Sequence, residues 1–125
     1  MDVGALFKTI PRKSLLGLLQ PNGTVDVLAT RDFLGFSKEE VASATNVPGG
    51  SVRFDERMPA EVRDRMLEIA IICELVAEHF GGAEKAALWF KVDNPLLGNM
   101  SPRDMIRLGR FKKLHRFVLE ALTGT

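Results

Sequence analysis

The apolar residues of this chain recur at three- and four-residue spacing, which is the pattern of α-helices that bury one face. The longest such pattern runs from Pro59 to Phe80 and ends at a pair of glycines, Gly81 and Gly82. Because proline fixes the backbone for a first helical turn, we predict one long amphipathic helix over this segment. Its apolar stripe consists of Val62, Met66, Ile69, Ala70, Cys73, Val76, Ala77 and Phe80.

Shorter helices are predicted before the long one. Residues 24–33 form the first, with Thr24 as its cap and Gly35 as its stop. Residues 37–45 form the second, because Ser37 and Glu40 have the spacing of a capping box. Residues 49–57 are a weak third candidate, since two adjacent glycines cost a helix about 1 kcal/mol each relative to alanine.

Three further helical segments are separated by strong turn signals. Residues 83–90 form a helix that the Asp93-Asn94-Pro95 sequence breaks. Ser101 then caps a helix that Gly109 ends, and residues 110–122 form the last one. No segment alternates apolar and polar residues as a half-buried strand does, so the predicted fold is all-α.

Three regions follow from this pattern. Residues 1–23 are an N-terminal extension in which Leu15, Leu16, Leu18 and Leu19 are expected to form one short apolar helix. Residues 24–80 contain the first helices and the long one. Residues 81–125 form a small C-terminal helical region.

Composition supports an ordinary globular protein. The chain has 125 residues, of which 46% are hydrophobic and 26% charged, with a formal net charge of +1. The charge is unevenly spread: acidic residues dominate from Asp55 to Glu84 and basic residues from Arg103 to Arg116. We expect either two solvated helix faces or, at the basic end, a surface for a partner.

The single cysteine, Cys73, permits no internal disulfide, which fits a reducing compartment, and we expect a cytoplasmic protein. The N-terminus lacks the features of a signal peptide, and no apolar stretch approaches the roughly 18 residues of a membrane span. His79 and His115 are the only histidines, and neither stands in a ligand-spaced motif. We therefore predict no catalytic residues, no metal site and no cofactor.

Residues 37–57 have features of a helix-turn-helix. Ala42 is small enough for close helix packing, Asn46 can adopt the left-handed turn, and Val47 is an apolar plug. DNA contacts would come from Lys38, Ser51, Arg53 and Arg57. The alternative is a helix-turn-helix that does not read DNA, because Gly49-Gly50 weaken the reader helix and Asp55-Glu56 repel phosphate.

The C-terminal region contains an ordered set of short motifs, in the sequence AALWFKVDNPLLGNMSPRDMIRLGRFKKLHRFVLEAL. It resembles the toxin-binding domain of the Xre/MbcA/ParS antitoxins. The elements that carry the resemblance are Ala86-Ala87, Trp89-Phe90, Asn94-Pro95, Leu97-Gly98, Ser101-Pro102, Met105-Ile106 and Gly109. With the preceding part, the resemblance covers about residues 24–123.

The resemblance implies an antitoxin of a type II toxin–antitoxin system. Such proteins bind a cognate toxin, often a RES-domain toxin that consumes NAD, and block its active site. Many form homodimers and repress their own operon, alone or as the toxin–antitoxin complex. The alternative is a stand-alone helix-turn-helix transcriptional regulator. The expected toxin contacts are Asp93, Asn94, Leu97, Gly98, Asn99, Arg107, Arg110, Lys113, Arg116, Leu122, Thr123, Gly124 and Thr125.

A homodimer is also expected from the residues themselves. The 59–80 helix and the N-terminal leucines offer more apolar surface than so short a chain is expected to bury alone.

Overall fold

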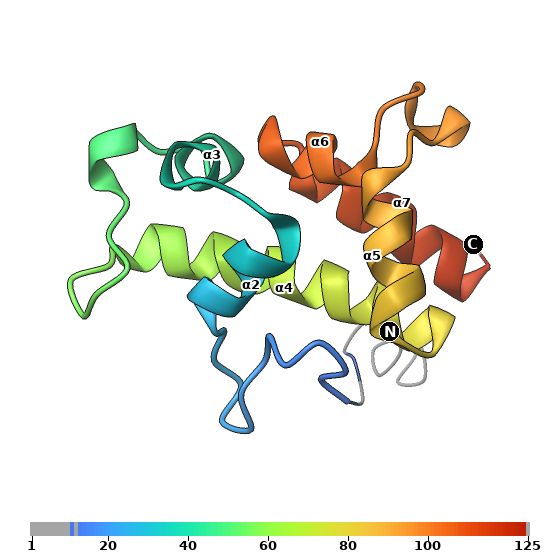
Figure 1. Cartoon of the computed structure of the whole chain (residues 1–125), viewed down its shortest axis with the longest axis horizontal. Coiled ribbons are helices and arrows are strands. Elements are labelled where there is room, and N and C mark those ends of the chain that lie inside the picture. Colours follow the sequence, from blue (N-terminus) through green and yellow to red (C-terminus); the bar gives the residue numbers. More distant parts are fainter. Residues whose placement is uncertain (1–10, 12, 125) are drawn as a thin grey trace.

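The structure, a computed structural model, describes residues 11 and 13–124; residues 1–10, 12 and 125 lie outside the described part. Within that part the regular elements are all helical, and the prediction of an all-α fold is confirmed (Figure 1). The α-helices are α2 (Val27–Leu34), α3 (Lys38–Ala44), α4 (Ala60–Phe80), α5 (Ala83–Lys91), α6 (Pro102–Arg107) and α7 (Phe111–Thr123). Two 3-10 helices, η1 (Gly49–Ser51) and η2 (Pro95–Leu97), lie in the loops.

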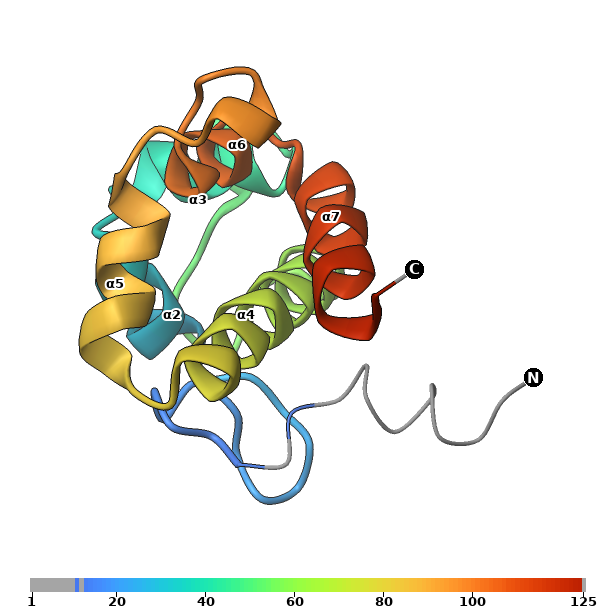
Figure 2. The ribbon, with the colours of Figure 1, turned by 90° about the vertical axis from the view of Figure 1, so that its right-hand side faces the viewer.

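Helix α4 is the element on which the others assemble. It contacts α2, α5 and α7, while α6 packs against α3, α5 and α7 (Figure 2). The predicted apolar stripe faces inward: from Val62 to Ala77 its residues are buried, and Phe80 at its end is partly buried. Gly81 then adopts φ 73°, the left-handed conformation that ends a helix at little cost for glycine.

The beginnings of the helices follow the capping rules, with one correction. Ser37 and Glu40 form the predicted capping box of α3. Asp26, and not Thr24, caps α2, because its carboxylate accepts a hydrogen bond from Ala29 N at 2.9 Å. The Thr24 hydroxyl is engaged elsewhere: it donates to the side chains of Gln20 and Asn22 in the preceding turn.

The prediction of a short apolar helix at Leu15–Leu19 is wrong. This segment is an irregular loop that pairs with Val25 through one isolated antiparallel bridge at Leu19. The reason is Glu74 of α4, which is fully buried and accepts hydrogen bonds from Leu16 N and Leu18 N at 2.9 Å each, and from the Ser14 hydroxyl. These donors satisfy a buried carboxylate. The backbone of residues 14–18 therefore adopts the conformation that bonds to Glu74 and does not form helical hydrogen bonds of its own.

The weak helix candidate at residues 49–57 is reduced to one 3-10 turn, η1. Val52 directly after it is fully buried, so the chain is anchored there in extended form. Asp55 then accepts hydrogen bonds from Arg57 N and from the Arg53 side chain, which fixes a turn where a second helix was predicted. The first helix and the turn of the predicted helix-turn-helix are present, with Asn46 at φ 57°, but the second helix is absent from these described residues.

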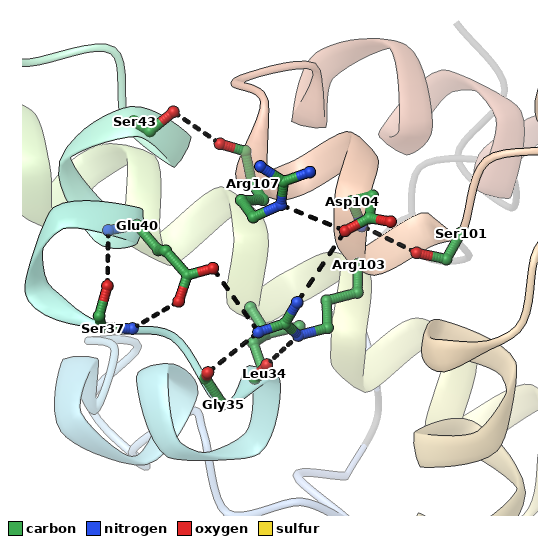
Figure 3. Close-up of polar contacts among 9 residues, drawn as sticks. All are labelled: Leu34, Gly35, Ser37, Glu40, Ser43, Ser101, Arg103, Asp104 and Arg107. Atoms are coloured by element: carbon green, nitrogen blue, oxygen red, sulfur yellow. Dashed lines mark hydrogen bonds and ion pairs between the residues drawn. The ribbon is translucent and has the colours of Figure 1, made fainter.

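A network of polar contacts joins α6 to α3 and to the C-terminal end of α2 (Figure 3). Arg103 Nη2 donates to Gly35 O at 3.0 Å, and the Arg103 side chain also reaches Leu34 O and the ring of Phe36, 4.9 Å from its centroid. The Ser43 hydroxyl donates to Arg107 O at 2.8 Å. We call this set of contacts the α3–α6 junction.

Regions 24–80 and 81–125 therefore share one hydrophobic core, which extends from Leu18 to Val118. Their division into separate functional regions stays a prediction.

Candidate partner-binding surface

The turn between α5 and α6 is a compact corner built on Asn94. Asn94 N donates to Met100 O at 3.1 Å, and Asn94 O accepts hydrogen bonds from Leu97 N and Asn99 N. The Asn94 side chain accepts a further one from Leu96 N at 2.9 Å. Gly98 and Asn99 follow in the left-handed region, at φ 70° and 61°. Backbone hydrogen bonds and the Asn94 side chain thus together fix the conformation of η2.

Large apolar side chains are exposed along this part of the molecule. Leu88 on α5 is 63% exposed, Val92 after it is 52% exposed, and Leu96 on η2 is 78% exposed. We call these three residues the apolar row. An exposed group of large aliphatic side chains is costly in water, so it indicates a surface that another molecule covers.

Beside the apolar row lies a groove of about 200 Å³. Its walls come from the C-terminal end of α4, from α5, from the corner and from α7. They are formed by Val76, His79, Phe80, Trp89, Asn94, Leu96, Phe117, Val118, Ala121 and Leu122. Leu96 belongs to both the row and the groove.

Basic side chains are exposed on α7 and at its N-cap. Arg110, Lys113 and Arg116 are exposed, and within the described residues no ion pair involves any of them. Arg107 differs, because its side chain bonds to Asp104 at 3.2 Å and its carbonyl accepts the Ser43 hydroxyl. Of the four predicted basic contacts, three are therefore free for a partner and one is used inside the fold.

Comparison with known proteins gives one structural likeness. No known family model and no curated protein matches the chain. Among solved structures, the chain is similar to one chain of "Crystal structure of the M.tuberculosis MbcT-MbcA toxin-antitoxin complex". The two are 20% identical with a TM-score of 0.48, and the match covers 79% of this chain and 92% of that chain. A likeness at this level carries no conclusion about function.

The structure gathers part of the predicted contact set. Asn94 and Leu122 line the groove, while Asp93, Gly98 and Asn99 are exposed on the corner. Leu97 packs partly against the core. Gly124 is exposed after α7, whereas the Thr123 side chain and Thr125 lie outside the description.

Sequence reasoning missed the apolar row. Only Leu88 and Val92 share a helical spacing, at the last turn of α5, whereas Leu96 lies past the Asn94 corner, so no local pattern groups the three. Trp89 was named in the sequence only as part of the family resemblance and Phe117 was not singled out, so neither was predicted to be the wall of a groove. That role depends on the relative placement of α5 and α7, which no local pattern contains.

The predicted DNA-contacting residues are only partly assembled. Lys38 and Arg53 line the same shallow depression beside η1. Arg53 is bound to Asp55 at 3.0 Å, and the N–H of Arg57 and the Arg53 side chain hold the pKa of that carboxyl below its usual range. Ser51 is half-buried and Arg57 exposed. A charge that is already neutralised in this way contributes less to phosphate binding, and DNA contact stays a prediction.

The reactive side chains lie apart from the groove's apolar walls, with His79 as the exception. Cys73 is fully buried, and burial raises the pKa of its thiol far above the normal range, which keeps it protonated and unreactive. His115 Nδ1 lies 3.9 Å from Glu68 Oε1, and burial lowers the pKa of this histidine.

In the part of the chain described, no three His, Cys, Asp or Glu side chains converge as metal ligands would. None of the helices described there has the length and apolarity to cross a bilayer.

Proposed function

We propose that this chain is the antitoxin of a type II toxin–antitoxin system and that it neutralises a cognate toxin by binding it. The contact surface is the apolar row together with the adjoining groove and the basic side of α7. The proposal assigns the chain no catalytic step; its action is to occupy and cover another protein.

The observation that carries the proposal is the apolar row. Leu88, Val92 and Leu96 are each more than half exposed, and Leu96 also lines an apolar groove. Large exposed apolar surfaces on soluble proteins often mark the place where a partner binds. Interfaces gain most of their energy from a few large side chains of this kind.

The finer part of the proposal comes from the sequence resemblance to the Xre/MbcA/ParS antitoxins. It names a RES-type, NAD-consuming toxin as the partner and obstruction of the toxin's active site as the mode of inhibition. Homodimer formation, a cytoplasmic location and repression of the operon belong to the same proposal. Because η1 has only three residues, operator binding is expected from a complex with the toxin more than from this chain alone.

The test is co-expression with the protein encoded next to this chain's gene. If that protein arrests growth alone, this chain is expected to restore growth. Leu96→Asp places a charge in the apolar surface, and we expect it to abolish rescue. Leu28→Asp is the matched control: Leu28 is 44% exposed on α2, away from the groove, so rescue should persist.

Two outcomes count against the proposal. One is that the neighbouring protein is not toxic or is not restrained by this chain. The other is that removal of residues 110–125 leaves rescue untouched, which places the contact surface elsewhere. A stand-alone regulator would instead shift DNA from the upstream region in an electrophoretic assay without any protein partner.

A further inference from the structure

We infer that the basic side of α7 contacts the phosphate backbone of duplex DNA. The basic side consists of Arg110, which is the N-cap of α7, together with Lys112, Lys113 and Arg116. This inference rests on the proposed repression of the operon and goes further, because it names the surface that touches DNA. It also narrows the proposed toxin contact, since the toxin then keeps the apolar row and the groove.

The basic side belongs to a run of bases that no acid interrupts. Five Lys or Arg residues and no Asp or Glu lie between Asp104 and Glu120. Arg107 is paired with Asp104, but among the described residues no ion pair involves any of the other four, and all four are exposed. Bases without partners attract a polyanion, because phosphates that they neutralise release bound counterions.

The three bases within α7 point away from the core and from the groove. Lys112 and Lys113 lie one turn before Arg116, so the three share the exposed side of the helix, which Glu120 ends one turn later. The residues that bury α7 in the core are Phe111, Leu114 and Val118. The α7 wall of the groove consists of Phe117, Val118, Ala121 and Leu122. A toxin in the groove would therefore leave the basic side accessible.

The turn that leads into the basic side is bonded to the partial helix-turn-helix, which is α3 and the turn at Asn46. The Ser43 hydroxyl donates to Arg107 O at 2.8 Å (Figure 3), and Asn46 Nδ2 donates to Gly109 O at 3.3 Å. Gly109 directly precedes Arg110 in the chain. The bases thus begin beside the part of the predicted DNA-binding motif that the fold contains.

The segment predicted to read DNA is poorly suited to phosphate. Its helix is reduced to the three residues of η1, and Arg53 after it is paired with Asp55 at 3.0 Å. Glu56 adds a second negative charge there, which repels phosphate. The basic side of α7 supplies the unpaired positive charge that this segment lacks, and phosphate contact is therefore assigned to α7.

The polar character of the basic side favours DNA over an acidic protein. Protein interfaces gain most of their energy from a few large buried side chains. Between Arg107 and Ala121, Leu108 is the one large apolar side chain that is exposed, at 42%, and it lies in the turn before α7. Contacts to DNA phosphates, in contrast, are made largely by Lys and Arg and require no apolar anchor.

The experiment measures binding of the full chain to a fluorescein-labelled DNA duplex of about 20 base pairs by fluorescence anisotropy. The duplex has an arbitrary sequence, because phosphate contacts do not read the bases. For four neutralised phosphates, log K against log salt should have a slope of about −3.6. Affinity is then expected to fall roughly 150-fold between about 50 mM and about 200 mM salt.

A triple charge reversal tests the assignment. Arg110→Glu, Lys113→Glu and Arg116→Glu together should lower the affinity at about 50 mM salt by at least about 30-fold and reduce the slope to about −1. The matched control reverses three exposed bases elsewhere, as Arg63→Glu, Lys85→Glu and Lys91→Glu. It changes the net charge equally, and we expect it to keep the slope and lose less than about fivefold in affinity. Circular dichroism shows whether each variant is folded.

Two further polyanions separate DNA from other partners. They are an RNA duplex of the same sequence and poly-L-glutamate, each used as a competitor of the labelled DNA. We expect DNA to be displaced by unlabelled DNA at lower concentration than by either of them. Poly-L-glutamate that competes as well as DNA would indicate an acidic protein partner and overturn the inference, and an RNA duplex that competes better than DNA would overturn it too.

The inference is also overturned if the duplex does not bind at low salt, or if the triple reversal and its control bind equally. A third contrary result is a folded triple reversal that no longer restores growth in the co-expression assay, because the basic side would then contact the toxin. Failure of the unchanged chain to restore growth counts against the antitoxin proposal alone, since the anisotropy measurement contains no toxin.

Discussion

The α3–α6 junction and the groove end of the molecule use the same residue types for opposite purposes. At the junction, Arg103 bonds to two backbone carbonyls and lies over the ring of Phe36. At the groove Leu96 is 78% exposed, and on α7, which forms one groove wall, Arg116 and Lys113 have no ion-pair partner among the described residues. One region directs its polar and apolar groups inward, and the other leaves them for a second molecule.

The difference teaches where substitutions should affect stability and where they should affect binding. Groups at the junction are already bound within the chain, so removing them leaves buried partners unsatisfied. Groups at the groove end lose little on replacement, because water surrounds them in the free protein.

The largest effect on stability is expected at Glu74. Glu74→Ala leaves Leu16 N, Leu18 N and the Ser14 hydroxyl without their acceptor, and we expect a loss of about 3 kcal/mol in the free energy of unfolding. Glu120→Ala on the exposed side of α7 should change it by less than about 0.5 kcal/mol. Urea denaturation measures both. Equal stability of the two variants would remove Glu74 as the anchor of the N-terminal loop.

Arg103→Ala is expected to have the next largest effect. It removes hydrogen bonds to Leu34 O and Gly35 O and the contact with Phe36, and we expect a loss of about 2 kcal/mol. Arg116→Ala should leave the thermal midpoint nearly unchanged but weaken partner binding. If Arg116→Ala destabilised the chain as much as Arg103→Ala does, the contrast between the two regions would be wrong.

Two glycines of similar backbone conformation sharpen the contrast. Gly109 has φ +80°, and a Cβ there would lie 2.5 Å from Asn46 Oδ1, whereas Gly98 has φ +70° with nothing within 4 Å. We expect about 1.5 kcal/mol of destabilisation for Gly109→Ala and about 1 kcal/mol for Gly98→Ala. Adding Asn46→Ala should remove the excess at Gly109 only. Thermal melts of the four variants give the comparison.

The smallest effect is a dependence on pH. Burial lowers the pKa of His115 in the folded chain, although Glu68 opposes the shift. The unfolded state therefore binds the proton more readily, and this contribution to stability is lost as pH falls from the unfolded value near 6.5 through the lower folded one. His115→Gln should reduce that slope. Urea midpoints across this range would show it, and identical slopes would contradict it.

Much of the fold could be predicted from local sequence. The capping box at Ser37, the stop at Gly81 and the cap at Ser101 each depend on residues a few positions apart. The failures have the opposite character. The local pattern predicts a helix at Leu15–Leu19, but it cannot show the carboxylate that holds this segment. That carboxylate belongs to Glu74, about 60 residues away in the chain.

The candidate site shows the same division. The corner at Asn94 and the basic residues of α7 were visible in the sequence, since turn chemistry and charge are local properties. The groove was not, because Phe80, Trp89, Leu96 and Phe117 meet only after α4, α5 and α7 have packed. The sequence also did not show which basic side chains are free for a partner, because the pairing of Arg107 with Asp104 is seen only in the structure.

The sequence by itself determined most of the helices, most of their ends and the basic character of α7, because apolar period, capping and charge act over a few residues. Tertiary structure decided which apolar residues remained uncovered, which charges found partners and where the second predicted helix of residues 49–57 gave way to a turn. These outcomes depend on contacts between segments far apart in the chain. Such contacts form only when the helices pack together around one shared core.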